Sequence, residues 1–295
     1  ILLLLLLLRR RLVPLSLGAA GLCVLLLVDL GAVHQKALRH DDSLYAVIER
    51  IKGRVDAGLG TDKSLFRVGS FRNTLGANLE MALGYQTVGG FTALFPSRYY
   101  EYMTRYSENR LPEGWVSLFY GVTRHHVFMD LLNVKYEIAH AESLLGMRES
   151  CLPRAFIVPG SMVLSKTRGL EFMASGDFDP KKTVLLEKED FRTEPPLPLS
   201  DRAADEAQVE VTEFRPDRIR LAAQTPSPAY LFVSEIFYPG WKALIDGQPA
   251  RILRGNYLFR VLELPQGRHS IVLDFQPWTI RLGTAVTLLL LLSLG

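Results

Sequence analysis

Residues 238–247 read Tyr-Pro-Gly-Trp-Lys-Ala-Leu-Ile-Asp-Gly, and they lie a short way before a hydrophobic run at residues 280–295. Pro239 and Gly240 suit the two central positions of a type II turn, and Asp246-Gly247 suits a tight β-hairpin. The residues between these turns favour a strand. This decapeptide therefore predicts a turn, a strand and a hairpin just ahead of a segment that resembles a membrane helix.

The strand of the decapeptide, residues 242–245, is one of seven short runs of strand type. Turn residues such as glycine, proline, asparagine and aspartate separate the runs, as in an all-β domain. The other runs are residues 209–214, 218–223, 230–235, 250–253, 258–264 and 269–275. Seven strands at this spacing predict a β-sandwich. In the last run, His269, Ile271, Leu273 and Phe275 occupy alternate positions and should share one buried face.

The preceding region mixes helical and strand periodicity. The runs that favour helices are residues 44–51, 127–132 with Asn133 as the stop, and 168–174. The runs that favour strands are residues 65–71, 134–139, 155–158 and 183–186. These patterns predict a small α/β domain at residues 34–193, a proline-rich charged linker at residues 194–206 and the sandwich at residues 207–278.

Both ends of the chain are strongly apolar. Residues 12–30 are apolar except for Ser16 and Asp29, and a helix of that length spans roughly 28 Å at about 1.5 Å per residue, close to the bilayer core. Three arginines precede it, and the positive-inside rule places them in the cytoplasm. The expected segments are a helix end (1–8), a cytoplasmic turn (9–11), a transmembrane helix (12–33), the two domains outside the cytoplasm with their linker, and the start of another transmembrane helix (279–295).

The first residue is not Met and both ends lie within apolar runs. We therefore expect the chain to be a piece of a longer multi-pass membrane protein. A signal peptide is the alternative reading of the N-terminus, with the arginines ahead of an apolar core. The aliphatic residues 1–8 argue against it, because a signal peptide carries no such run before its basic residues.

Composition narrows the function classes. The formal net charge is +3 and basic and acidic residues are interspersed, so no nucleic-acid-binding face is predicted. The two cysteines, Cys23 and Cys151, provide no disulfide framework. Neither a phosphate-binding glycine motif nor a complete catalytic or metal-ligand motif occurs. We therefore expect no cofactor, no metal and no catalytic residue in this segment.

Several short motifs occur in a fixed order around the decapeptide. They are Ser234-Glu235, residues 238–242, Asp246-Gly247, Asn256, Phe259-Arg260, Leu264-Pro265 and residues 267–269, preceded by weaker blocks at residues 84–99, 131–136 and 152–156. This pattern resembles the C-terminal extracytoplasmic domain of the YfhO-like bacterial membrane proteins. The resemblance extends from about residue 66 to the C-terminus.

The resemblance implies a glycosyltransferase of GT-C type in the bacterial cytoplasmic membrane. Such a protein would transfer a sugar from a polyprenyl-phosphate carrier to a cell-envelope glycan or a lipid-linked polymer. Its catalytic carboxylates would lie in the first extracytoplasmic loop, which this chain does not contain. The alternative is a non-enzymatic envelope protein, anchored in the bilayer, whose sandwich binds glycan or a partner protein. Further apolar spans upstream would favour the enzyme.

Aromatic residues near the decapeptide are candidates for stacking on sugar rings. Core packing explains Trp241 and Phe259 better, whereas both interpretations stay open for Tyr238 and Tyr257. We take Tyr238, Trp241 and Tyr257 as the candidate substrate-binding residues. The other motif residues are assigned structural roles: Glu235, Pro239, Gly240, Asp246, Gly247 and Asn256.

The orientation of the chain is testable. A reporter that is active only outside the cytoplasm, fused after Pro196 in the full reading frame, should be active, because the arginines at residues 9–11 hold their own turn in the cytoplasm. Enzyme activity in intact cells is the measurement. Activity at the same position from a reporter that works only in the cytoplasm would contradict the predicted topology.

Overall fold

A computed structural model of the protein describes most of the chain from residue 42 onward. The described residues are 14, 17, 20–21, 23–25, 27–29, 42–59, 62–70, 84–91, 96–105, 118–119, 126–140, 143–188 and 206–294. The chain forms two compact units, Ile1–Gly53 and Arg54–Gly295. Each unit is described by itself.

In the first unit, the described residues between 17 and 29 are helical. Pro14 is described and is not helical, whereas the remaining residues of the predicted segment 12–33 and the segments 1–8 and 9–11 lie outside the described residues. Helix α3 (Asp42–Leu59) begins here, contains the predicted helix at residues 44–51 and runs on into the second unit. Of the helices that the structure describes, none combines the length and the apolar character needed to cross a bilayer.

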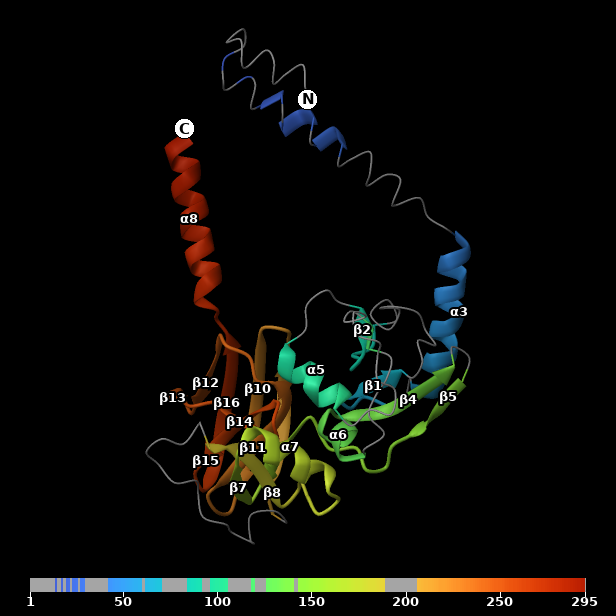
Figure 1. Ribbon diagram of the computed structural model, residues 1–295, viewed down its shortest axis with the longest axis vertical. Coiled ribbons are helices and arrows are strands. Elements are labelled where there is room, and N and C mark those ends of the chain that lie inside the picture. Colours follow the sequence, from blue (N-terminus) through green and yellow to red (C-terminus); the bar gives the residue numbers. More distant parts are fainter. Residues whose placement is uncertain are drawn as a thin grey trace. The chain divides into compact units, whose positions relative to one another are not determined.

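The second unit is built around two stacked sheets (Figure 1). The five-stranded sheet has the order β13-β12-β16-β10-β9 and comprises β9 (Gln208–Phe214), β10 (Arg218–Thr225), β12 (Trp241–Ile245), β13 (Gln248–Ala250) and β16 (Gly267–Phe275). The six-stranded sheet has the order β6-β11-β15-β14-β8-β7 and comprises β6 (Ala155–Val158), β7 (Gly160–Leu164), β8 (Thr183–Glu187), β11 (Ala229–Ile236), β14 (Leu253–Gly255) and β15 (Phe259–Leu264). The arrangement confirms a mixed α and β fold with a sandwich-like, sheet-rich C-terminal region.

The core between the two sheets follows from the alternation along each strand. Ile271 and Leu273 of β16 are fully buried, and they pack with Leu231 and Val233 of β11 from the facing sheet. Successive side chains of a strand point to opposite faces. The buried face predicted from the alternation in residues 269–275 is therefore confirmed.

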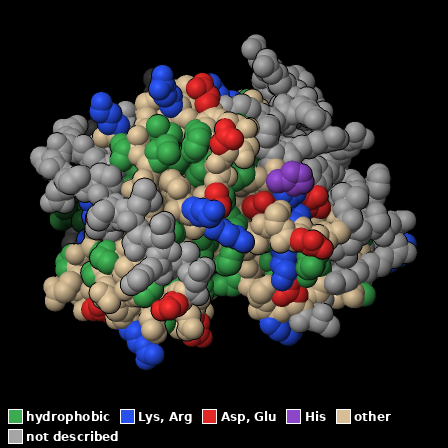
Figure 2. All heavy atoms as spheres, turned by 90° about the horizontal axis from the view of Figure 1, so that it is seen from below, with side chains coloured by type: hydrophobic (Ala, Val, Ile, Leu, Met, Phe, Trp, Pro, Cys, Tyr) green, Lys and Arg blue, Asp and Glu red, His purple; other side chains and the backbone are tan. Residues whose placement is uncertain are grey.

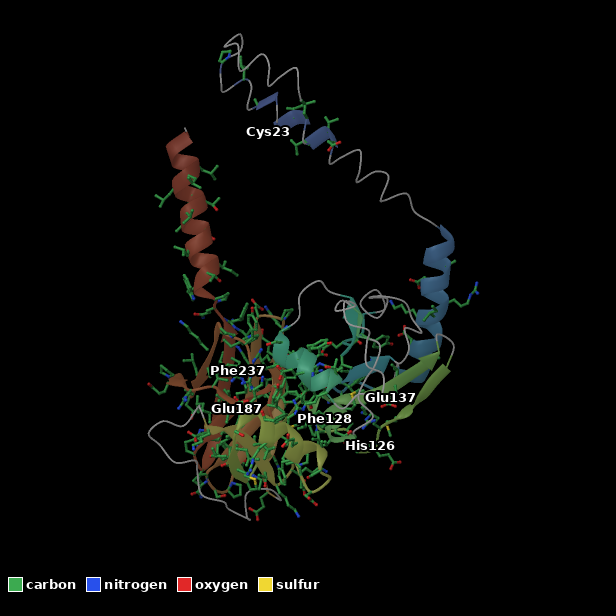
Figure 3. The ribbon with its side chains drawn as sticks, viewed as in Figure 1. Cys23, His126, Phe128, Glu137, Glu187 and Phe237 are labelled. Carbon is green, nitrogen blue, oxygen red and sulfur yellow. The ribbon has the colours of Figure 1, made fainter. Side chains whose placement is uncertain are left out.

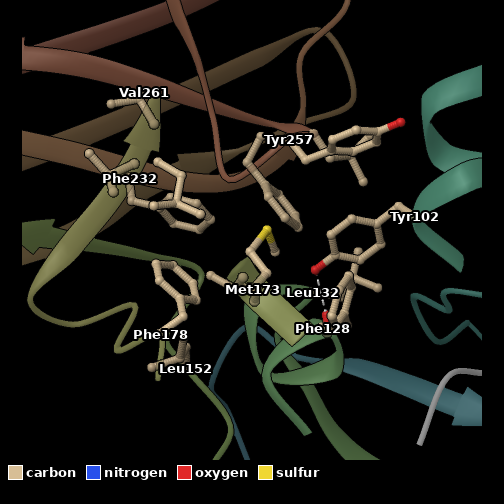
Figure 4. Packing of buried hydrophobic residues seen from close by; sticks show 14 of the residues in the cluster. Tyr102, Phe128, Leu132, Leu152, Met173, Phe178, Phe232, Tyr257 and Val261 are labelled. Carbon is tan, nitrogen blue, oxygen red and sulfur yellow. Dashed lines mark hydrogen bonds between the residues drawn. The ribbon is translucent and has the colours of Figure 1, made fainter. Parts of the chain in front are cut away.

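Helices cover the other face of the six-stranded sheet. They are α5 (Ser97–Thr104), α6 (His126–Leu131) and α7 (Lys166–Ala174). Tyr102 of α5 packs against Phe128 of α6, donates a hydrogen bond of 2.8 Å to its carbonyl oxygen, and reaches the strands below (Figure 4). Strand β11 is therefore buried on both faces, which explains its nearly continuous hydrophobic sequence.

The six-stranded sheet contains strands from before and from after the predicted linker in the sequence. Strands β6, β7 and β8 precede residues 194–206 and strands β11, β14 and β15 follow them. Strands β7 and β8 are parallel neighbours, and α7 lies between them in the sequence as the crossover helix. The sandwich and the region before it consequently share one sheet.

Two smaller sheets complete the unit. One has the order β1-β4-β5 and contains β1 (Arg67–Ser70), β4 (Val134–His140) and β5 (Ser143–Met147); the other pairs β2 (Gly90–Phe91) with β3 (Leu118–Phe119). Between α6 and β4, Asn133 adopts a φ of 57°, a conformation that asparagine tolerates better than most residues. The predicted stop of the helix at Asn133 is confirmed.

The predicted strand at residues 250–253 is wrong. Strand β13 ends at Ala250 in one sheet and β14 begins at Leu253 in the other, so the chain changes sheets at Arg251 and Ile252. The turns predicted at Pro239-Gly240 and at Asp246-Gly247 agree with the backbone conformation, since Gly240, Asp246 and Gly247 all have positive φ. At the turn after β14, Asn256 and Tyr257 adopt positive φ.

Gly255 is required for space rather than for backbone conformation. A Cβ atom there would overlap Val261 Cγ2 and lie 2.9 Å from Val184 Cγ2. We expect Gly255→Ala to destabilise the fold by about 1–3 kcal/mol, as overpacking of a dense core does. The control is Gly169→Ala in α7, where a Cβ meets nothing within 4 Å and should stabilise by about 0.5–1 kcal/mol. Denaturant unfolding measures both, and equal stability of the two variants would contradict the packing.

Candidate functional site

Three arginines gather around Glu235 at one end of the six-stranded sheet. Arg67 donates a hydrogen bond of 2.6 Å to Oε1 of Glu235, and Arg154 donates one of 2.7 Å to the same oxygen. Arg260 lies on the neighbouring strand β15 and donates from Nε to the carbonyl oxygen of Ile236 at 3.0 Å. Its guanidinium carbon lies 3.7 Å from the centre of the Trp241 ring. The site thus contains three guanidinium groups and one carboxylate.

A bulge in β11 gives Glu235 its position. Val233 pairs with Arg260 and Ile236 pairs with Phe259, so Ser234 and Glu235 are extra residues in the ladder. A bulge of this kind redirects side chains at the edge of a site. The hydroxyl of Ser234 donates to the carbonyl oxygen of Leu131 at 2.6 Å, which fixes the bulge against the end of α6.

Arg67 and Arg154 are held rigidly on either side of the bulge. Arg67 donates from Nη1 to the carbonyl oxygen of Ser234 at 2.9 Å, so it contacts the backbone of the bulge as well as Glu235. Arg154 donates from Nε to Oδ1 of Asn133 at 2.9 Å and from Nη2 to Gln86 at 2.7 Å. Arg154 therefore uses all three of its guanidinium nitrogens within the protein.

The charges in the cluster are unbalanced. Burial, together with repulsion from Arg67, lowers the pKa of Arg154 to about 10 despite the attraction of Glu235. Burial also lowers the pKa of Arg260 to about 10, opposed by Glu235 and assisted by Arg67. Both shifts have the direction expected when buried positive charge exceeds the negative charge that accompanies it.

A pocket of about 430 Å³ opens beside this cluster, and we call it the arginine pocket. It is lined by Arg67, Thr87, Val88, Pro96, Tyr99, Leu132, Pro216, Ser234, Glu235, Ile236, Tyr238, Trp241, Phe259, Arg260 and Phe275. Tyr238 is 54% exposed, and the ring of Phe275 lies 6.4 Å from it and 5.4 Å from Trp241. One wall is therefore aromatic and another is cationic.

The pocket lies where the sandwich continues into helix α8 (Trp278–Leu294). Phe275, the last residue of β16, lines the pocket and is three positions before Trp278. The amide of Gln276 donates to the carbonyl oxygen of Gly240 at 2.7 Å, which ties the turn of the decapeptide to this connection. Helix α8 exposes large apolar side chains, among them Trp278 at 70% and Leu289 at 66%.

The candidate substrate-binding residues separate into two places. Tyr238 and Trp241 both line the arginine pocket. Tyr257 is only 4% exposed and packs in the core beneath α5, where its hydroxyl donates to Glu101 and its carbonyl oxygen accepts a hydrogen bond of 3.1 Å from Arg98. Tyr257 thus has the position of a packing residue.

The residues assigned structural roles have local partners. Asp246 accepts from the amide of Ser270 at 2.8 Å and contacts His269 at 2.7 Å. Asn256 accepts from the amide of Leu185 at 2.8 Å. Gly240 has a φ of 103°, and Pro239 precedes it in the turn. Glu235 differs from this group because it lines the pocket.

Sequence reasoning missed the three arginines as a group. Arg154 and Arg260 belong to the motif blocks at residues 152–156 and 259–260, yet nothing in the sequence joins them. Arg67 lies 168 positions before Glu235. A pairing between residues so far apart depends on the packing of β1 and α6 against the bulge.

A second charged cluster surrounds Arg148. It pairs with Asp130 at 2.9 Å and with Glu137 at 2.6 Å, and it contacts His126. Figure 3 labels His126 and Glu137. Among the residues that the structure describes, no three His, Cys, Asp or Glu side chains are grouped to hold a metal ion. Burial raises the pKa of the nearby Cys151 thiol to about 11, which disfavours the reactive thiolate. On the face shown in Figure 2, charged side chains of both signs are interspersed.

Comparison with known proteins gives one family match. The family described as bacterial membrane protein YfhO matches residues 179–287. These residues include β8, the whole decapeptide at residues 238–247 and the start of α8. Neither the curated proteins nor the solved structures provide a match.

The shared carboxylate can be tested by mutation. We expect Glu235→Gln to destabilise the protein by about 3 kcal/mol, because removing one member of a buried ion pair leaves the other unpaired. Glu213→Gln is the matched control, since Glu213 also pairs with two arginines, but these are 68% and 51% exposed; its loss should cost less than about 1 kcal/mol. Thermal or denaturant unfolding measures both, and a Glu235→Gln variant as stable as the control would contradict the assigned role.

Proposed function

Since the chain belongs to the YfhO-like family of bacterial membrane proteins, we propose that it is the extracytoplasmic region of a membrane glycosyltransferase of GT-C type. The family gives it a membrane-associated role at the cell envelope. In the proposed reaction, a sugar passes from a polyprenyl-phosphate carrier to an envelope glycan or a lipid-linked polymer. Residues upstream of this chain would supply the catalytic carboxylates.

The arginine pocket is the observation that supports this proposal. It combines half-exposed aromatic rings with fixed polar groups, the composition typical of sites that bind small polar molecules. Aromatic faces pack against the C–H groups of sugar rings, and Tyr238, which is 54% exposed, is available for such a contact. Trp241 contributes a second ring, which contacts the guanidinium group of Arg260 and the ring of Phe275.

The position of the pocket fits a substrate that reaches it along the membrane. Phe275 and the turn at Gly240 join the pocket to the connection that leads into the apolar helix α8. We propose that α8 enters the bilayer, with Trp278 at its surface, where tryptophan is favoured. A lipid-linked sugar would then arrive beside Tyr238 and Trp241.

The proposal is tested with the full reading frame in its native host. Deletion of the gene should remove one sugar from an envelope polymer, and the wild-type gene should restore it. Tyr238→Ala should restore only part of the sugar, because its ring supplies an exposed wall of the pocket. Met147→Ala on β5 is the control, since Met147 is equally exposed at 57% but lies outside the pocket.

Mass spectrometry of the purified envelope polymers measures the outcome. Unchanged polymer sugars in the deletion strain would contradict the transferase function. If the chain nevertheless bound purified envelope glycan, the non-enzymatic envelope protein would be the correct alternative.

A further inference from the structure

We propose that the arginine pocket binds a phosphate-type oxyanion and that Arg260 is the residue that contacts it. The inference depends on the proposed function only for the molecule that carries the phosphate. The site itself follows from unpaired polar atoms, charge and position in the fold.

The guanidinium group of Arg260 is buried but incompletely hydrogen-bonded. Arg260 is only 4% exposed, and it lines the arginine pocket. Nε is occupied by the carbonyl oxygen of Ile236, whereas Nη1 has no hydrogen-bond partner among the described residues. A buried N–H group without a partner is costly, and the cost is higher when the group is charged. A bound anion in the pocket would satisfy this donor.

Among the hydrogen bonds of the described residues, none joins the neighbouring carboxylate of Glu235 to Arg260. Within the described part of the chain, Glu235 uses its Oε1 atom for both Arg67 and Arg154. The charged groups that act on Arg260 are Glu235 and Arg67, and they have opposite effects. The cluster therefore contains three guanidinium groups and one carboxylate, and an added anion would reduce its excess positive charge.

The orientation of Arg260 suits a tetrahedral oxyanion. Its guanidinium carbon lies 3.7 Å from the centre of the Trp241 ring, and this cation–π contact restrains the group. An arginine held in this way can give two parallel hydrogen bonds to phosphate. Helix α5 adds to the positive potential, because its first residue follows Pro96 of the pocket wall and no acidic residue occupies its first turn.

Volume and position favour phosphate over a small carboxylate. About 430 Å³ is enough for a phosphate together with part of a sugar, and Tyr238 and Trp241 offer rings to the sugar. The pocket also adjoins the connection into α8. Two sources provide this chemistry at such a place: the phosphate of a lipid headgroup and a phosphate in solution or on a polymer.

The test is a titration of the full chain in zwitterionic detergent micelles with inorganic phosphate and, separately, with acetate. Phosphate should shift the indole N–H resonance of Trp241, assigned with Trp241→Phe, and raise the melting temperature. Arg260→Gln should weaken phosphate binding about tenfold or more, as expected for loss of a charge-assisted bidentate contact. Arg268→Gln removes one exposed positive charge from β16 and should leave binding unchanged.

Several results would overturn the proposal. They are the absence of a phosphate response in the wild-type chain, acetate binding as tight as phosphate binding, and equal loss of affinity in Arg260→Gln and Arg268→Gln. If Arg260→Gln does not fold, the wild-type titration of the Trp241 resonance decides, because a phosphate bound elsewhere would not shift it.

Vesicles distinguish the two sources of phosphate. Phosphatidylcholine vesicles that contain phosphatidic acid should compete with inorganic phosphate if the ligand is a lipid headgroup, and pure phosphatidylcholine vesicles should not. Competition assigns the lipid source, and its absence assigns a soluble or polymer phosphate. Because neither arm involves sugar transfer, phosphate binding would persist if the transferase function were disproved, and transfer in cells could persist if phosphate binding failed.

Discussion

The carboxylate of Glu235, shared between Arg67 and Arg154, is the interaction on which the arrangement of the second unit depends. It joins the first residue of β1, the residue just before β6 and the bulge in β11, three segments that are far apart in sequence. Arg154 is almost completely buried, so a single unpaired charge there would be costly. The ion pairs therefore select one position of the bulge, and that position shapes the arginine pocket.

The six-stranded sheet is buried on both faces, so the position of β11 that the Glu235 ion pairs select also affects the packing of the rest of the unit. Leu231 and Val233 of β11 pack into the sandwich, while Tyr230 and Phe232 pack under the helices. A shift of β11 would disturb both cores at once, because dense interiors have few alternative arrangements. The pocket is thus lined in part by a strand that packs on both faces, which suits a site that holds charged groups in fixed geometry.

The arginine pocket adjoins the connection into the apolar helix α8. The pocket shares Phe275 with the end of β16, and α8 begins three residues later. The turn at Gly240, the aromatic wall and the connection to α8 form one continuous structure through the hydrogen bond from Gln276 to Gly240. A ligand in the pocket would consequently lie close to the start of α8.

Local sequence determined the features that depend on near neighbours. The stop of α6 at Asn133, the strand at residues 155–158 and the hairpin at Asp246-Gly247 follow from backbone preferences that each residue carries with it. The sequence also indicated Tyr238 and Trp241 as site candidates. Only the tertiary structure decided that β6, β7 and β8 join the sandwich sheet, that Tyr257 is buried beneath α5, and that Arg67 reaches Glu235. These features arise from pairings between distant segments, whose energies depend on burial and on charge partners that no single stretch of sequence contains.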